Sequence, residues 1–369
     1  MMRDTGIFKG EEQIMFALRE LYQSYGYQQY QVSKFEEYDL YAQNRNFLAS
    51  KQLLTFHDTN GKLMALKPDV TLSVIKNTRP EQLPRKLYYT ENVYRVPKNA
   101  YGFREIMQTG LEYIGEADLY TTSEVVMLAA KSLNVISPDH VLCLSHLGLI
   151  SGILKAANLS EEQEAQVLTL LGERNAHDLA ALGLPKEWEE TLTALLALRG
   201  PLDLTLSKAE ALALPEESRQ ALQELSALCR LVNRFGFSQV ELDFSLVGNT
   251  DYYQGLIFRG FVNGVPSSVL SGGRYDPLLR KMAKPGQGIG FAVYLDQLDR
   301  IVGSRPRYDV DVLLSYDPDS DAETVLRTAE RLLAAGKRVR VQQEEAGELT
   351  YAVHMQVQGE EVVTLETLC

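Results

Sequence analysis

The sequence predicts an α+β fold in which an antiparallel sheet forms the core, with a helical insertion and a small C-terminal α/β unit. Three observations predict it. Strand-like and helix-like patterns follow one another unevenly, unlike the regular alternation of a doubly wound parallel sheet. Residues 159–235 are rich in Ala, Leu and Glu and poor in strand formers. A proline-containing joint, GSRPRYD at 303–309, then separates a final short segment from the rest.

The N-terminal region predicts a helix and, further on, a hairpin. Residues 10–25 place apolar side chains at helical intervals and stop before Gly26, which indicates an amphipathic helix with a glycine at its end. Residues 52–57 and 63–66 indicate a hairpin, because Asn60-Gly61 between them is a strong tight-turn dipeptide.

After the hairpin, a helix is expected at 69–76, with Asp69 or Thr71 able to cap it. A succession of strands and helices follows. Strands are expected at 27–36, 86–95, 104–114, 139–144, 239–246, 254–263 and 266–272. Helices are expected at 121–134, 146–157 and 293–303. The tail predicts a strand, a helix, a strand and two weaker strands at 309–315, 322–335, 337–342, 349–357 and 361–365. The predicted domains are a core formed by 1–158 and 236–304, an insertion of four or five short helices at 159–235, and a C-terminal unit at 305–369.

Composition argues against several classes of function. A net charge of −12 repels nucleic-acid phosphates. No apolar run approaches the roughly 20 residues that cross a bilayer, and no apolar signal core is present, so a cytoplasmic protein without membrane contact is expected. Cys143 and Cys229 are expected to be small core residues, and Cys369 to be incidental. The five histidines lack metal-ligand spacing, so neither a metal site nor a cofactor is expected.

Five segments combine polar residues with apolar patterns. Gln108 and Glu112 lie four residues apart, which on a strand places them on one face. An amide and a carboxylate on such a face are costly to bury unless they bind something. Taken singly, GGRYD is most often a turn with a buried tyrosine, and DYYQG an aromatic core strand. The segments are LKPDVT (66–71), VYRVPKNAYGFREIMQTGLE (93–112), SLVGNTDYYQGLIF (245–258), SGGRYDPLL (271–279) and GIGFAVYLDQL (288–298).

In order and spacing, these segments together resemble the catalytic core of histidyl-tRNA synthetase, over about residues 5–300. The resemblance implies a class II synthetase-like antiparallel core, a homodimer formed through it, and a pocket for free histidine. A pocket that hydrogen-bonds its ligand rejects analogues without those groups, because its own buried polar atoms would go unpaired. The histidine-binding residues implied by the resemblance are Asp69 and Thr71 for the α-amino group, Gln108 further along the same pocket, and Glu112, Tyr253 and Tyr275 for the imidazole.

The residues that handle ATP in that family are incomplete here. Arg95 and Arg104 remain as remnant anion contacts. Gly248 and Gln297, however, stand where the family has arginines that meet the phosphates, and Tyr294 stands at the position of a family glycine. The loss of one fixed donor costs roughly 3–4 kcal/mol of transition-state stabilisation. The resemblance therefore implies a synthetase relative that has no catalytic residues for adenylate formation.

This pattern of kept and lost residues is similar to the regulatory subunits of ATP phosphoribosyltransferase, a paralogous family. The similarity implies a non-catalytic subunit that assembles with a short-form ATP phosphoribosyltransferase catalytic subunit, as a homodimer within a hetero-oligomer. Such a subunit is required for the partner's activity and for allosteric feedback by histidine on the first step of histidine biosynthesis. Two other hypotheses stay open. One is an active histidyl-tRNA synthetase or other adenylate-forming enzyme, with Arg259 or Arg274 replacing the lost arginines, and the other is a structural module with a vestigial pocket.

Overall fold

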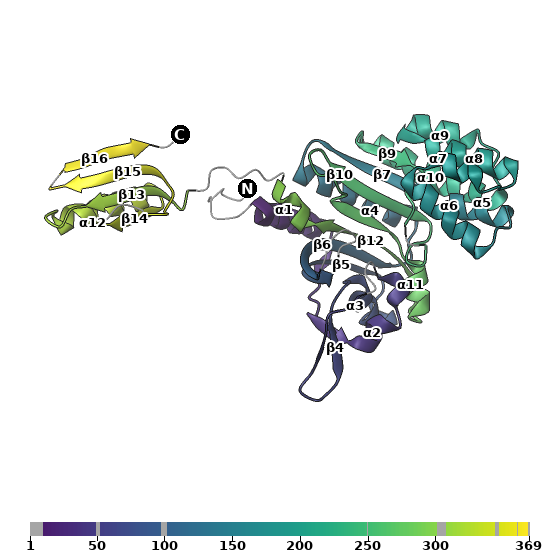
Figure 1. Cartoon of the computed structure of the whole chain (residues 1–369), viewed down its shortest axis with the longest axis horizontal. Coiled ribbons are helices and arrows are strands. Elements are labelled where there is room, and N and C mark those ends of the chain that lie inside the picture. The colour runs from purple at the N-terminus through teal and green to yellow at the C-terminus, as the bar shows by residue number, and fades with distance from the viewer. Residues whose placement is uncertain are drawn as a thin grey trace. The chain divides into compact units, whose positions relative to one another are not determined.

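The computed structural model describes residues 10–48, 52–96, 102–248, 250–300, 308–343, 347–359 and 361–367. The chain divides into two units, Met1–Val302 and Gly303–Cys369 (Figure 1). Across the described ranges, no helix combines the length and the apolar character that crossing a membrane requires. Cys143 and Cys229 are buried, as predicted, whereas Cys369 lies outside the described residues.

The first unit is built on a nine-stranded sheet with the order β1-β5-β6-β12-β11-β10-β7-β9-β8. Neighbouring strands are antiparallel except in the pairs β1–β5 and β7–β9, which are parallel. The predicted fold class is therefore confirmed. In chain order the strands are Gln28–Gln29 (β1), Arg85–Arg95 (β5), Arg104–Gly115 (β6), His140–His146 (β7), Arg199–Pro201 (β8), Val240–Asp243 (β9), Leu256–Val262 (β10), Leu270–Arg274 (β11) and Gln287–Tyr294 (β12).

Helices surround this sheet. The first ends before Gly26, whose φ of +77° is a left-handed conformation that glycine adopts without strain. The helices of the first unit are Gly10–Ser24 (α1), Tyr38–Ala42 (α2), Thr71–Lys76 (α3), Leu119–Ile136 (α4), Leu147–Ala156 (α5), Glu161–Glu173 (α6), Ala176–Ala181 (α7), Lys186–Ala197 (α8), Leu202–Glu210 (α9), Glu216–Arg234 (α10) and Asp276–Lys281 (α11). Short 3-10 turns span Arg45–Phe47 (η1), Pro80–Gln82 (η2) and Leu295–Arg300 (η3).

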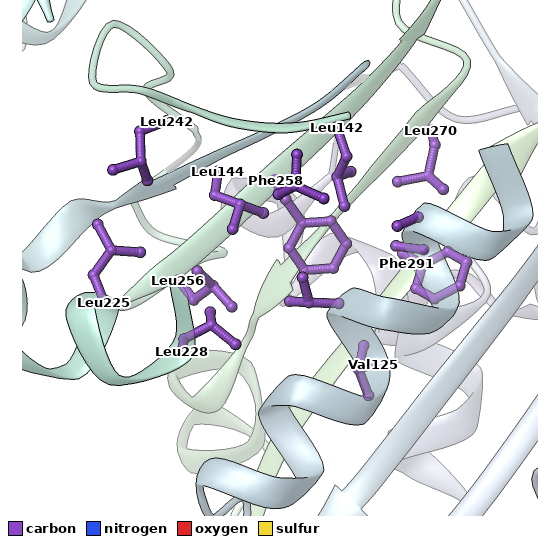
Figure 2. Close-up of a cluster of buried hydrophobic side chains, with 14 of the residues drawn as sticks. Val125, Leu142, Leu144, Leu225, Leu228, Leu242, Leu256, Phe258, Leu270 and Phe291 are labelled. Atoms are coloured by element: carbon purple, nitrogen blue, oxygen red, sulfur yellow. The ribbon is translucent and has the colours of Figure 1, made fainter. Parts of the chain in front are cut away.

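One face of the sheet packs against α1, α4 and α10, and this layer contains the larger core. Figure 2 shows leucines from the sheet and from α10 pointing toward Phe258 of β10. The ring of Phe258 lies 6.2 Å from that of Phe291 on β12, between centroids, and both rings are buried. Removal of this apolar surface from water is the main stabilising contribution to the unit.

The other face of the sheet carries a smaller core, formed with α2, α3 and α11. Beside it lies a three-stranded sheet, β2-β4-β3, whose strands are Phe35–Glu37 (β2), Thr55–His57 (β3) and Leu63–Leu66 (β4). β3 and β4 form the predicted hairpin, with Gly61 at a φ of +81° in its turn. This second face of the nine-stranded sheet holds the polar residues of the site.

The segment between β7 and β9 is mostly helical. It contains α6 to α10 and the short strand β8, which pairs with β9 at the edge of the sheet. α10 has 19 residues and is longer than the short helices that the sequence predicts. Asp243 of β9 anchors this segment, because its buried carboxylate pairs with Arg174, at the end of α6, and accepts a hydrogen bond from Ser245 Oγ at 2.6 Å.

The second unit has a four-stranded sheet with the order β14-β13-β15-β16. Val325 and Ala329 of its helix pack against Leu314 and Val357 of the sheet. The predicted strands and helix of the tail are confirmed, with small shifts of their ends. They are Val310–Tyr316 (β13), Ala322–Ala334 (α12), Val339–Gln342 (β14), Tyr351–Gln358 (β15) and Glu361–Thr367 (β16).

The prediction of a helix at 293–303 is wrong for its first two residues. Residues 287–294 form the central strand β12, and the described helical residues are those of η3, Leu295–Arg300. β12 is buried along most of its length, so its apolar run lacks the alternation that identifies a half-buried strand. The sequence also does not predict α11, a helix of 6 residues.

Candidate functional site

Strand β6 places two predicted site residues on the second face of the sheet. Gln108 and Glu112 line the same cavity, and each is only 2 % exposed. Leu111 and Tyr113 of the same strand belong to the larger core on the other face. The two-residue period of a strand therefore separates site residues from core residues within one element.

All six residues predicted to bind histidine line this cavity, whose volume is about 190 Å³. They come from four places: the start of α3, strand β6, the segment before β10 and the segment after β11. Tyr89, Ser271 and Gly290 share the wall, although the sequence does not single them out. Their contribution depends on the pairing of β5, β11 and β12 with their neighbours, which no local pattern contains.

Thr71 and Glu112 are in direct contact. Thr71 Oγ1 donates a hydrogen bond to Glu112 Oε1 at 2.6 Å, although 41 residues separate them in the chain. The resemblance assigns them to opposite ends of a bound amino acid. They form one hydrogen-bonded pair, so the two residues are adjacent in the wall.

Three buried polar atoms of the wall have no hydrogen-bond partner among the described residues: Gln108 Nε2, Glu112 Oε2 and Tyr275 Oη. Buried polar groups are almost always paired, and leaving one unpaired costs about 1–3 kcal/mol. Gln108 Nε2 is a donor, the Tyr275 hydroxyl serves as donor or acceptor, and the Glu112 carboxyl group accepts when ionised and can also donate when protonated. They fit a ligand that offers both donors and acceptors.

Burial controls the protonation of the two carboxyl groups in the wall. It raises the pKa of Glu112 to about 8; the hydrogen bond from Thr71 and the nearby hydroxyl of Tyr275 oppose this shift, and the charge of Asp69 adds to it. Burial also raises the pKa of Asp69, against the opposing charge of Arg95, whose Nη2 lies 3.8 Å from the Asp69 carboxylate. A cationic ligand group beside these carboxyl groups favours their ionised forms.

Arg95 is the one cationic side chain among the described residues that line the cavity. Its Nε also donates to the carbonyl oxygen of Pro68 at 2.5 Å, which ties the loop before α3 to β5. Arg104 is its cross-strand partner on β6, but this residue is exposed and lies outside the cavity wall. Of the two predicted anion contacts, the structure brings Arg95 to the site and leaves Arg104 away from it.

Tyrosine rings form a large part of the wall. The ring centroid of Tyr252 lies 4.6 Å from that of Tyr253 and 6.3 Å from that of Tyr275. Glycines on the neighbouring strands leave room for these rings. A Cβ on Gly288 would overlap the ring of Tyr275, and a Cβ on Gly273 would approach Tyr253 to 2.8 Å.

The two positions predicted to have lost arginines do not line the cavity. Gln297 of η3 instead accepts a hydrogen bond from Ser267 Oγ at 2.8 Å. Gly248 lies beside the ring of Tyr253, where a Cβ would be 3.2 Å from the nearest ring carbon. Neither position supplies a hydrogen-bond donor to the cavity.

Other residues near these positions do not restore the missing charge. Arg259 donates to the carbonyl oxygen of Val247 at 3.1 Å, and Arg274 pairs with Asp276 at 2.8 Å. Both arginines lie outside the cavity wall. Tyr294 does line the cavity, and its hydroxyl lies 2.6 Å from Ser271 Oγ. The arrangement can hold a small polar ligand. For a polyphosphate, however, the described wall provides a single cationic side chain, that of Arg95.

Comparison with known proteins gives concordant results. The model of the histidyl-tRNA synthetase family matches residues 7–298. The chain is 28 % identical over 355 residues to an ATP phosphoribosyltransferase regulatory subunit of Geobacillus thermodenitrificans, covering 92 % of this chain and 89 % of that protein. It is 29 % identical over 339 residues to a histidine–tRNA ligase of Methanocaldococcus jannaschii, covering 88 % and 80 %. The crystal structure of an ATP phosphoribosyltransferase regulatory subunit/histidyl-tRNA synthetase from Bacillus halodurans matches with a TM-score of 0.76 and 25 % identity, over 96 % of both chains.

Proposed function

The chain belongs to the histidyl-tRNA synthetase family, and on that premise we propose that it is a non-catalytic regulatory subunit of ATP phosphoribosyltransferase. It binds free histidine in the cavity beside β6 and conveys feedback control to the first step of histidine biosynthesis. Similarity to the Geobacillus regulatory subunit over 92 % of this chain supports this proposal.

The hydrogen-bonding groups of the cavity support histidine as the ligand. A protonated α-amino group needs carboxylate and hydroxyl acceptors, and an imidazole needs groups that both donate and accept. The unpartnered atoms of Gln108, Glu112 and Tyr275 provide such groups. The proposed assignment is Asp69 and Thr71 for the amino group, Gln108 further along the same pocket, and Glu112, Tyr253 and Tyr275 for the imidazole.

The shortage of positive charge is the observation that carries the non-catalytic part of the proposal. Adenylate formation places negative charge on the α-phosphate as pyrophosphate leaves, and fixed cations must stabilise it. In the described cavity wall Arg95 alone is cationic, and neither Gly248 nor Gln297 reaches it. Two missing donors lower the rate by roughly 10⁴-fold or more. The ring of Tyr294 further occupies space that the family leaves to a glycine.

The proposal includes an assembly. The partner is a short-form ATP phosphoribosyltransferase catalytic subunit, and this chain forms a homodimer through its antiparallel core within the hetero-oligomer. The complex acts in the cytoplasm. For histidine to regulate it, histidine must bind one state of the complex more tightly than another, with a coupling free energy of typically 1–3 kcal/mol.

Calorimetric titration with histidine and then with ATP tests the site. Histidine is expected to bind, and neither ATP binding nor histidine-dependent pyrophosphate exchange is expected. Glu112→Ala should abolish binding without loss of the fold, as monitored by circular dichroism. Unchanged affinity in that variant would remove Glu112 from the site.

A second assay tests the assembly. The purified chain is added to a short-form ATP phosphoribosyltransferase, and the activity of that enzyme is measured with and without histidine. Activation that histidine reverses is expected. The 29 % identity to a histidine–tRNA ligase keeps one alternative, an active synthetase or other adenylate-forming enzyme. Pyrophosphate exchange by the purified chain would establish that alternative and overturn the non-catalytic part of the proposal.

A further inference from the structure

A second and larger cavity lies between the core and the helical segment of the first unit. Its volume is about 670 Å³. Figure 1 shows α5, α6 and α10 gathered beside the β7–β9 end of the sheet, and these helices provide one wall. The other wall comes from the end of β11, the start of α11 and the loop before β10. The proposed function does not use this cavity, although Tyr253 lines both cavities.

The helical wall of this cavity is aliphatic. Leu147, Ile150 and Leu154 of α5 line it together with Leu168 of α6. The three α5 residues follow one another at intervals of three and four, so they share one face of the helix. This wall is complementary to a branched aliphatic group.

The two walls carry opposite charges that do not neutralise each other directly. Arg274, on the core side, donates from Nη2 to Asp276, but its Nε is buried and has no hydrogen-bond partner among the described residues. Glu224, on α10, has a side chain that is 65 % exposed. None of the described ion pairs joins these two residues, although both line the cavity.

His146 lies beside the Glu224 carboxylate. Its Nδ1 accepts a hydrogen bond from the backbone nitrogen of Gly148 at 3.2 Å, so the ring carries its hydrogen on Nε2. Nε2 lies 3.5 Å from Glu224 Oε2. The hydrogen bond from His146 lowers the pKa of Glu224, and the charge of Arg274 contributes in the same direction. Glu224 is therefore a carboxylate, and it lines this cavity and a neighbouring one of about 300 Å³.

We propose that this cavity binds a free α-amino acid with an aliphatic side chain, with its carboxylate on Arg274 and its ammonium group on Glu224. An α-amino acid carries its two charges on neighbouring groups, so it can bridge a guanidinium and a carboxylate that line one cavity without forming an ion pair. A ligand carboxylate gives the Arg274 guanidinium a second acceptor, since Asp276 takes only Nη2 and Nε has no partner among the described residues.

The balance of charge in the wall distinguishes this ligand from a simple anion. Three carboxylates and two guanidinium groups line the cavity: Glu164, Glu224, Asp276, Arg274 and Arg280. A phosphate would therefore meet more negative than positive charge at short range. A zwitterion has no net charge and satisfies both signs, while its side chain contacts the aliphatic wall.

Calorimetric titration of the full chain with L-leucine, leucinamide and 4-methylpentanoate tests the proposal. Leucinamide lacks the carboxylate and 4-methylpentanoate lacks the ammonium group, while both keep the branched side chain. Leucine is expected to bind at least about tenfold more tightly than either analogue, because each analogue leaves one charged group of the wall without its partner. Inorganic phosphate is expected not to bind.

Variants of the two walls locate the ligand. Glu224→Gln and Arg274→Gln are each expected to weaken leucine binding about tenfold or more. Glu217→Gln is the matched control, because Glu217 is another exposed glutamate of α10 that pairs with Lys155 and does not line the cavity. Ser151→Trp, at an exposed position of α5 that lines the cavity, should block binding by filling the space.

Several results would overturn the proposal: no binding of leucine, equal binding of 4-methylpentanoate, or unchanged leucine affinity in Glu224→Gln. Leucine binding that is lost in Glu112→Gln and kept in Glu224→Gln would place leucine in the first cavity, which also overturns it. If Arg274→Gln does not fold, Glu224→Gln and Ser151→Trp decide the matter, since both change exposed positions. Histidine binding to the first cavity is measured separately, so failure of one proposal leaves the other standing.

Discussion

Glu112 of β6 and Gly290 of β12 are cross-strand partners, and the Glu112 carboxylate occupies the space that a Cβ at position 290 would need. The first cavity therefore depends on a missing side chain in the neighbouring strand. Any residue larger than glycine at this position must displace the carboxylate or separate the strands.

Gly290→Ala is expected to weaken histidine binding at least tenfold, because the displaced carboxylate loses its hydrogen bond from Thr71. It is also expected to destabilise the fold by about 1–3 kcal/mol, the usual cost of overpacking. In a Glu112→Ala background the loss of stability caused by Gly290→Ala should be smaller, because the carboxylate is absent. It should not disappear, since the carbonyl oxygen of Leu111 lies close to the same space. Calorimetry and urea unfolding of the single and double variants measure both effects.

The stability of the protein without histidine is expected to fall as pH rises from about 5 to about 8. Burial raises the pKa of Glu112 from 4.5 to about 8, so across that interval the folded chain holds a proton that the unfolded chain releases. The contribution is a few kcal/mol, fully present below the unfolded-state pKa and lost above the folded-state pKa. Glu112→Gln should remove most of this slope.

Some pH dependence is expected to remain in the Glu112→Gln variant, because burial raises the pKa of Asp69 as well. Urea unfolding at several pH values, for the original chain and for Glu112→Gln, measures the two slopes. Identical slopes would show that Glu112 does not titrate in this range.

Thr71→Val should weaken histidine binding about tenfold, because it replaces the hydroxyl that donates to Glu112 with a methyl group of similar size. Thr71→Ser keeps the hydroxyl and is the matched control, with an affinity expected within about threefold of the original. Calorimetry measures both variants. Equal affinities for Val and Ser at this position would mean that the hydroxyl makes no contribution.

Phe258→Ala is expected to lower the free energy of unfolding by about 3–5 kcal/mol, because it opens a cavity in the core shown in Figure 2. Phe258 is 1 % exposed, whereas Phe235, just after α10, is 68 % exposed. Phe235→Ala is therefore expected to change stability by less than about 0.5 kcal/mol. Denaturant unfolding of the two variants compares the same substitution at a buried and an exposed position.

The sequence predicts the elements of this protein better than the pairings between them. The two-residue period is enough to place Gln108 and Glu112 on one face, and the structure has them there. The contact between Tyr294 and Ser271 depends instead on the register of β11 against β12, which no local pattern contains. Tyr294 itself lies in an apolar run that is buried on both faces, where strand and helix patterns look alike.

A buried ion pair illustrates the same difficulty. Lys67 is 1 % exposed and pairs with Glu91 at 2.6 Å, across 24 residues of sequence. A lysine beside a proline is typical of an exposed loop, and only the folding of β5 against this loop supplies the carboxylate that makes its burial tolerable. Spacing within one segment cannot predict such a partner.

The alternation along β6 has a consequence for how this protein tolerates mutation and acquires new ligands. Gln108 and Glu112 face the cavity, whereas Leu111 and Tyr113 hold the sheet to its helices. The cavity wall and the core thus use alternate positions of one strand. A library that varies the cavity positions and leaves the core positions intact should yield folded proteins with altered selectivity, and the complementary library should yield few folded proteins. A lineage could exchange one small polar ligand for another along this strand without passing through unstable intermediates.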